Sequence, residues 1–157
     1  QRAINNIQGC YLSNSYIYAL QSDFTFNNNR CSNSKIKIGD ATGTSSVAKI
    51  SDNIFAGLLS GQNEVIEIDP TSNWYKIFTI QNNSFSMQST DSRCIRISPD
   101  DGGTNTLINV QGNTFWRSGT TLSYSSTIKV NYSQNIAYST THPTATGNLF
   151  VNGNYTY

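Results

Sequence analysis

Short segments in which apolar and polar residues alternate strictly recur along the chain. Alternation with a period of two and many β-branched residues is typical of a strand that buries one face. These four-residue segments, the tetrads, are Ile17–Leu20, Ile36–Gly39, Ile66–Asp69, Ile95–Ser98 and Ile128–Asn131. They predict five equivalent strands whose isoleucine side chains point inward.

A second motif lies between the tetrads. It consists of an apolar residue, two polar or small residues, an asparagine, any residue and an aromatic residue. Clear copies are Ile50–Phe55, Ile80–Phe85, Val110–Phe115 and Ala145–Phe150, and weaker ones are Ile7–Leu12 and Phe26–Cys31. Alternating residues lead into most copies, so each unit contains a strand, an asparagine corner, an aromatic position, a loop and a second strand. The asparagine positions, with Cys10 in the first copy, are 19, 24, 30, 30 and 35 residues apart.

Strands that recur in this way can bury their inner faces by coiling, so that each strand pairs in parallel with its equivalent one turn later. Neighbouring turns of such a β-solenoid lie about 4.8 Å apart, and each turn contacts only its neighbours. Stacking then forms one inner column of tetrad isoleucines and another of Phe55, Phe85, Phe115 and Phe150, continued by Cys31 and Leu12. An antiparallel sandwich is the alternative, but it gives no reason for the asparagine corner to recur beside a second strand.

The asparagine corners carry a prediction of their own. Asparagine tolerates the left-handed backbone conformation that a sharp corner needs. Its side-chain amide can also hydrogen-bond to its own copy in the next turn. The expected column is Asn29, Asn53, Asn83, Asn113 and Asn148.

Composition narrows the functional class. Asn, Ser and Thr supply 58 of 157 residues, only 12% of residues are charged, and the net charge is +1. This charge gives no field for capturing a nucleic-acid backbone, and no run of 18 apolar residues suggests a membrane helix. The lone His142 and the three cysteines have no spacing typical of a metal site or a disulfide framework. We therefore expect no cofactor, metal ion, nucleic acid or membrane insertion, and reduced cysteines.

The asparagine–x–phenylalanine corners, the isoleucine–x–isoleucine strands and the irregular loops resemble the right-handed parallel β-helix of the pectin-lyase-like superfamily. The low charge and the high Asn, Ser and Thr content are most similar to bacteriophage tailspikes and tail fibres. The resemblance implies one all-β domain over residues 1–157 with about five to six turns, a fragment of a longer chain. Residues 132–157 would then be a capping or terminal segment. It also implies a parallel homotrimer in the virion tail, next to other tail proteins, that binds a bacterial surface polysaccharide along the outer face of the tetrads.

The outward tetrad positions contain two candidate catalytic acids, Glu67 and Asp69. Glycosidic cleavage needs one protonated and one ionised carboxyl group, about 5–5.5 Å apart in retaining enzymes and about 6.5–9.5 Å apart in inverting ones. Residues i and i+2 of one strand lie roughly 6.6 Å apart, which suits either geometry. The neighbouring Lys37 and Arg96 lower the pKa of a carboxyl group, which suits a base or nucleophile better than an acid. The alternative interpretation is a surface charge ladder that contributes little to stability.

Aromatic and charged residues near this face are candidates for glycan binding. An aromatic ring can cover the apolar face of a pyranose, and Trp116 points outward if Phe115 points inward. A subunit interface is the alternative interpretation of the tryptophans, and Asp100–Gly102 is also a typical turn sequence. The candidate glycan-binding residues are Lys37, Trp74, Tyr75, Arg96, Asp100, Asp101, Trp116 and Lys129.

Three functions remain open on the sequence. The first is a phage receptor-binding segment that recognises a bacterial surface polysaccharide, with or without cleaving it. The second is a free-standing microbial polysaccharide hydrolase or lyase, and the third is an adhesin-type structural solenoid. Whether the protein is an enzyme is therefore left open.

Overall fold

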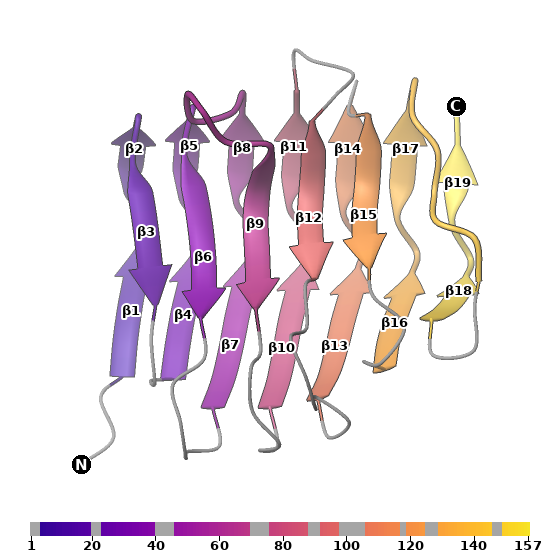
Figure 1. Ribbon diagram of the computed structural model, residues 1–157, viewed down its shortest axis with the longest axis horizontal. Coiled ribbons are helices and arrows are strands. Elements are labelled where there is room, and N and C mark those ends of the chain that lie inside the picture. Colours follow the sequence, from indigo (N-terminus) through magenta and orange to yellow (C-terminus); the bar gives the residue numbers. More distant parts are fainter. Residues whose placement is uncertain are drawn as a thin grey trace.

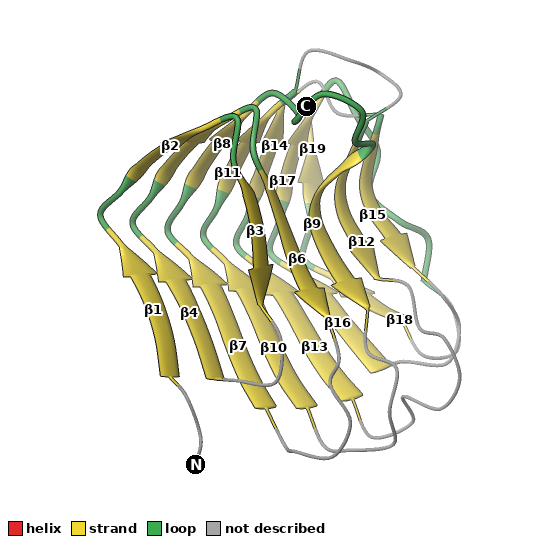
Figure 2. Cartoon of the chain, turned by 60° about the vertical axis from the view of Figure 1, so that its left-hand side comes forward, coloured by secondary structure: helices red, strands yellow, loops and turns green. Residues whose placement is uncertain are grey.

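The chain forms a parallel β-helix. The computed structural model describes residues 4–19, 23–39, 46–69, 76–87, 92–97, 106–116, 119–124, 129–145 and 149–157. In this part of the chain the strands form three sheets, every strand pair is parallel, and the sheets surround one elongated core (Figures 1 and 2). No helix in the described residues is long and apolar enough to cross a membrane.

We name the sheets after the sequence elements that build them. The lead-in sheet consists of β1 (Ile4–Gln8), β4 (Asp23–Asn27), β7 (Ser46–Ser51), β10 (Lys76–Gln81), β13 (Thr106–Gln111), β16 (Lys129–Ser133) and β18 (Leu149–Asn152). The corner sheet consists of β2 (Tyr11–Ser13), β5 (Arg30–Ser32), β8 (Ile54–Ala56), β11 (Ser84–Ser86), β14 (Thr114–Trp116), β17 (Ile136–Tyr138) and β19 (Tyr155–Thr156). The tetrad sheet consists of β3 (Tyr16–Ala19), β6 (Lys35–Gly39), β9 (Glu64–Asp69), β12 (Arg93–Ile97) and β15 (Thr120–Tyr124).

An asparagine ladder runs through the corner between the lead-in and corner sheets, as the sequence predicted. The amide of Asn53 shows its unit. Its Oδ1 accepts hydrogen bonds from the backbone N (2.9 Å) and the Nδ2 (3.1 Å) of Asn29, and its Nδ2 donates to Asn83 Oδ1 (2.9 Å) and to Phe26 O (2.9 Å). Both donors and both acceptor positions of the buried amide are thus used. The ladder comprises Asn29, Asn53, Asn83, Asn113, Asn135 and Asn154.

The left-handed residue of each corner precedes the ladder asparagine, so the expectation that the ladder asparagine itself adopts this conformation was wrong. The ladder asparagines themselves are not among the residues with positive φ. Asn28, Asp52, Asn82, Gly112, Gln134 and Gly153 have φ between 54° and 65°. At Gly112 a Cβ would also lie only 2.7 Å from Asn82 Oδ1.

The corners of the last two turns differ from the sequence prediction. Asn135 and Asn154 occupy the ladder positions, whereas Asn148 lies outside the described residues. Phe150 is exposed on β18 rather than stacked on Phe115. The corner sequences Tyr132–Ala137 and Val151–Thr156 have Ala137 and Thr156 two positions after the asparagine instead of an aromatic residue, so the motif did not identify them. The lead-in and corner sheets therefore have seven strands each in the described residues, more than the five to six turns expected.

The tetrad sheet has five strands, but its last strand was assigned wrongly. Ile66 pairs with Ile36 and Ile95, and the fifth member of this column is Leu122 of β15. Lys129–Asn131 instead belongs to β16 of the lead-in sheet, where Val130 pairs with Ile108. Alternating residues look alike whichever sheet they enter, so alternation alone could not separate the two assignments.

The core contains a continuous stack of aromatic rings. The ring centroid of Phe85 lies 5.1 Å from that of Phe55 and 5.1 Å from that of Phe115. Phe26 (6.3 Å from Phe55) and Tyr132 (6.4 Å from Phe115) extend the stack at its two ends. Phe26 and Tyr132 come from the lead-in sheet, in the turns whose corner strands carry the small Cys31 and Ala137. In these two turns the lead-in sheet thus supplies the ring that the corner sheet lacks.

His142 lies in the loop after β17 and connects the last turns. Its Nδ1 lies 2.8 Å from the hydroxyl of Tyr132, and its Nε2 lies 2.9 Å from the carbonyl oxygen of Tyr155. Burial raises the pKa of the Tyr132 phenol. Because the carbonyl oxygen of Tyr155 can only accept, Nε2 of His142 is the donor of that hydrogen bond.

Replacing a ladder asparagine should destabilise the fold strongly. Asn83→Ala leaves the buried Asn53 amide without its acceptor, so we expect the free energy of unfolding to fall by about 2–4 kcal/mol. Urea unfolding followed by circular dichroism measures this. The control Asn109→Ala, on the outer face of the lead-in sheet, should change stability by at most about 0.5 kcal/mol. Equal effects of the two changes would contradict the importance of the ladder.

Candidate functional site

The outer face of the tetrad sheet carries the predicted column of polar side chains. Tyr18, Lys37, Glu67 and Arg96 occupy paired positions on β3, β6, β9 and β12. The next position is Ser123 of β15. Lys129 was expected at this position because its strand was assigned to the tetrad sheet. It instead lies exposed on β16 of the lead-in sheet. The structure thus brings together Lys37, Glu67, Asp69 and Arg96 and separates Lys129 from them.

Glu67 is the centre of an ion-pair network. Its Oε2 lies 2.6 Å from Lys35 Nζ, and its Oε1 lies 3.0 Å from Lys37 Nζ. Lys37 Nζ also lies 3.2 Å from Asp69 Oδ2, so one lysine bridges the two candidate acids. The Glu67 side chain is only 10% exposed. Both of its carboxylate oxygens are therefore held by cations in a largely buried position.

The network includes residues that the sequence analysis missed. Lys35 is buried and donates to Gln62 Oε1 (2.7 Å), which ties the segment before β9 to the sheet. Arg96 Nη1 pairs with Glu64 Oε1 at 2.9 Å, and no ion pair between Arg96 and Glu67 is seen among the described residues. Lys35 lies two residues before Lys37, so the period-two rule already placed it on the same face. Glu64 and Gln62 had no comparable signal, because the period of two places them in phase with the inward-facing Ile66.

The surroundings of Glu67 favour its ionised form. Burial alone would raise the pKa of this carboxyl group, but the hydrogen bonds and charges of Lys35 and Lys37 together outweigh burial, and the net direction is downward. The sequence analysis anticipated this direction from Lys37. An ionised Glu67 can accept hydrogen bonds but cannot serve as a proton donor to a leaving group.

Two exposed tyrosines extend the network along the same face. Tyr16 and Tyr18 of β3 are 49% and 52% exposed, and their ring centroids lie 6.4 Å apart at an interplanar angle of 54°. The rings are therefore tilted rather than stacked on each other, and about half of each residue is exposed. Lys35 Nζ lies 6.0 Å from the centroid of the Tyr16 ring. Tyr18 was recognised in the outer column, but neither tyrosine was predicted as a binding residue.

The other predicted glycan-binding residues do not join this face in the described part of the chain. Trp74, Tyr75, Asp100 and Asp101 lie outside the described residues. Trp116 points outward as expected, but from β14 of the corner sheet. Its ring centroid lies 5.0 Å from that of Tyr138, which in turn lies 5.1 Å from that of Tyr157. Trp116 thus belongs to a separate aromatic row near the last turns.

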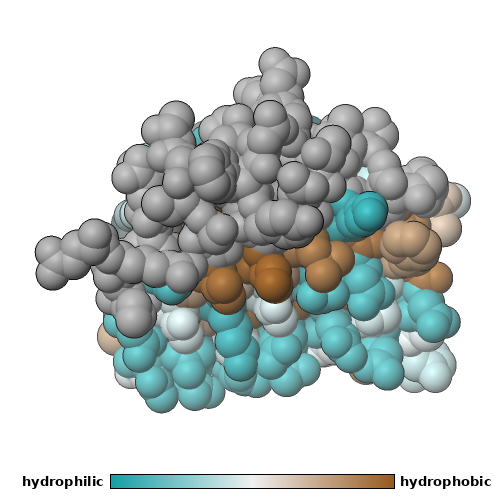
Figure 3. All heavy atoms as spheres, turned by 90° about the horizontal axis from the view of Figure 1, so that it is seen from below, coloured by the Kyte–Doolittle hydropathy of each residue, from teal (hydrophilic) through white to brown (hydrophobic). Residues whose placement is uncertain are grey.

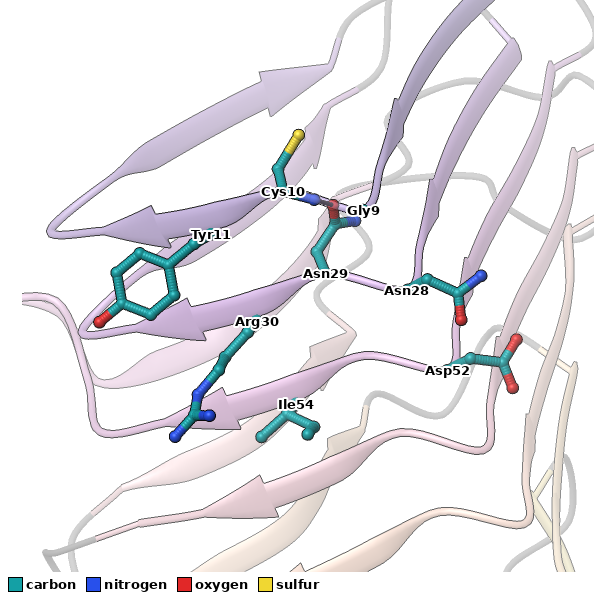
Figure 4. A pocket seen from close by; sticks show the side chains of 8 residues that line it. All are labelled: Gly9, Cys10, Tyr11, Asn28, Asn29, Arg30, Asp52 and Ile54. Atoms are coloured by element: carbon teal, nitrogen blue, oxygen red, sulfur yellow. Dashed lines mark hydrogen bonds between the residues drawn. The ribbon is translucent and has the colours of Figure 1, made fainter.

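A shallow depression of about 370 Å³ lies outside the first corners (Figure 4). Its lining includes Cys10, Tyr11, Arg30 and Asp52, and the side chains of Arg30 and Asp52 point in different directions. Within the described residues, no three His, Cys, Asp or Glu side chains form a group that could hold a metal ion. The tetrad face is therefore the better candidate for a functional surface.

Comparisons with known proteins add no relative to this geometry. No protein-family model matches the chain, and searches of curated proteins and of solved structures found no match either.

The ion pairs of Glu67 predict how stability depends on pH. Because the folded-state pKa of Glu67 lies below its usual value of 4.5, its contribution is fully present above that value. It is lost as the pH falls through the folded-state pKa. Each unit of depression corresponds to about 1.4 kcal/mol. We expect Glu67→Gln to be less stable than the wild type at pH 7 and to lose less stability between pH 5 and 3.

Thermal unfolding across this pH range tests the prediction. Asp52→Asn is the matched control, because Asp52 is an exposed corner residue outside the network and asparagine tolerates its left-handed backbone. Parallel pH profiles of the wild type and Glu67→Gln would show that the ion pairs do not stabilise the fold.

Proposed function

We propose that the tetrad face binds a bacterial surface polysaccharide, and that the chain is part of a tailspike or tail fibre of the pectin-lyase-like kind. The observation that carries the proposal is the outer column of β3, β6, β9, β12 and β15. In this column the half-exposed ring of Tyr18 is aligned with the charged groups of Lys37, Glu67 and Arg96, one position per turn. The phage setting rests on the resemblance of the sequence to that family.

The column suits a long, linear ligand. Five neighbouring strands span roughly 19 Å along the axis, so a polymer lying on this face meets a new side chain at every turn. Tyr16 and Tyr18 offer apolar ring faces together with polar hydroxyl groups, a combination that suits partly apolar, hydroxyl-rich ligands. Sugar rings combine these two properties.

The charged part of the face supplies fixed hydrogen-bonding groups. Lys37, Asp69 and Arg96 are partly exposed, and their ion pairs restrain them before a ligand arrives. Restraint of this kind lowers the entropy lost on binding. Hydrogen bonds from charged groups to sugar hydroxyls are also stronger than neutral ones.

The proposal assigns binding rather than cleavage to Glu67 and Asp69. A glycosidase needs one carboxyl group that is protonated at working pH, whereas both oxygens of Glu67 are paired with lysines. Asp69 shares Lys37 with Glu67. These contacts suit two carboxylates that position cations and accept hydrogen bonds.

Binding to a panel of immobilised bacterial capsules and O-antigens tests the proposal. We expect the wild type to bind at least one polysaccharide and Tyr18→Ala to bind it roughly tenfold more weakly, equal to about 1.4 kcal/mol. Tyr11→Ala is the matched control, because Tyr11 is an exposed tyrosine on another face, the corner sheet. It should bind like the wild type.

The size of the polysaccharide after incubation separates binding from cleavage. Shortening by the wild type that Glu67→Gln abolishes would show that Glu67 is catalytic and would favour the hydrolase or lyase alternative. Absence of binding to every polysaccharide of the panel would refute the proposal and favour a structural solenoid.

A further inference from the structure

The tetrad strands carry more than half of the charged residues in the described part of the chain. They are the bases Lys35, Lys37, Arg93 and Arg96 and the acids Glu64, Glu67 and Asp69. The lead-in sheet instead presents the exposed apolar side chains of Val47, Ile77 and Leu107 on its outer face. Figure 3 shows a row of apolar side chains, bordered by hydrophilic ones, on the face seen from below. The charge of a ligand therefore matters most on the tetrad face.

The two bases of the outer column each face acids of the same chain. Lys37 Nζ lies 3.0 Å from Glu67 Oε1 and 3.2 Å from Asp69 Oδ2, and Arg96 Nη1 lies 2.9 Å from Glu64 Oε1. Burial would lower the pKa of Lys37, but the hydrogen bonds and charges of Glu67 and Asp69 raise it. The hydrogen bond to Glu64 likewise raises the pKa of Arg96. The negative potential of the chain's own acids thus prevails at both bases.

The two other bases of the tetrad strands also lie beside acids. Lys35 is buried, and its Nζ lies 2.6 Å from Glu67 Oε2. Arg93 is the strand partner of Glu64 in the register of β12 and β9. An acidic sugar would therefore meet an acid of the chain at every base of these strands.

The sequence that adjoins the tetrad strands adds further acids and no bases. The segments that directly follow these strands are residues 20–22, 40–45, 70–75, 98–105 and 125–128, which lie outside the described residues. They contain Asp40, Asp100 and Asp101 but no lysine or arginine. The adjoining sequence therefore contributes only negative charge.

We propose that the polysaccharide bound by the tetrad face is uncharged, an inference that rests on the proposed function. A sugar hydroxyl both donates and accepts hydrogen bonds, so it can lie between Lys37 and Asp69 and satisfy both. The carboxylate of an acidic sugar can only accept. It would lie beside Asp69 whenever it contacts Lys37, and like charges in contact oppose binding.

The salt dependence of binding to the panel of capsules and O-antigens is the first test. We expect the polysaccharide that the wild type binds to contain no charged sugar. Its Kd should change less than about twofold between 0.05 and 0.5 M NaCl, because contacts with an uncharged polymer are little screened. Preference for an acidic polysaccharide would overturn this inference and leave the proposed function standing. Absence of binding to the whole panel would refute both.

Two derivatives of the bound polysaccharide isolate the effect of charge. Carboxymethyl and hydroxyethyl groups are similar in size, but only the first is negatively charged. At equal degrees of substitution, we expect the wild type to bind the carboxymethyl derivative about tenfold more weakly than the hydroxyethyl derivative. Added salt should reduce this difference, because it screens the repulsion. Equal binding of the two derivatives would overturn the inference.

A variant of the face tests which acid causes the discrimination. Asp69→Asn removes the charge beside Lys37, so the ratio of the two dissociation constants should fall by roughly threefold. Asp52→Asn is the matched control, because Asp52 is exposed at a corner outside the network, and its ratio should equal that of the wild type. Thermal unfolding shows whether both variants are folded. An unchanged ratio in folded Asp69→Asn would contradict the inference.

Discussion

The fold depends on one interaction, the hydrogen bonding between stacked asparagine amides at the corner between the lead-in and corner sheets. Each inner amide of the ladder is buried, and its donors and acceptors are satisfied by the turns before and after it. A slip of one residue would place a different side chain in the ladder and leave buried polar groups unpaired, which is costly. The ladder therefore fixes the register of every strand that follows it.

Fixed register turns a repeating sequence into straight columns of side chains on each outer face. The tetrad face gains its tyrosines and ion pairs in this way, and the lead-in face gains the paired side chains of Val47, Ile77 and Leu107.

The sequence predicted the parts of the fold that repeat most closely. The ladder, the aromatic column and the parallel pairing were all predicted from two repeated residue types. These are the asparagines Asn53, Asn83 and Asn113 and the phenylalanines Phe55, Phe85 and Phe115. The prediction failed near the last turns, where the motif changes. In the turn of Asn135, the ring comes from Tyr132 on the preceding strand while the corner strand has Ala137. A search for an aromatic residue two positions after each asparagine misses this exchange, because here the ring comes from the other strand of the turn.

The candidate site was predicted in outline but not in its contacts. Alternation placed Lys37, Glu67 and Arg96 in one column, whereas the partner of Arg96 is Glu64, which lies before the tetrad. Such a contact depends on how the strand is entered and on side-chain reach, and neither can be read from a period of two. Lys129 was misplaced because its alternating segment could enter either sheet.

Either the lead-in strand or the corner strand of a turn can supply the core ring. The side-chain sizes at these two positions therefore depend on each other, although they lie on separate sheets. A larger residue at Cys31 would collide with the ring of Phe26, and a smaller residue at Tyr132 would leave a void above Ala137. Changes at such positions are tolerated best as compensating pairs. Homologous chains should therefore show an inverse relation of side-chain volume across this corner, turn by turn.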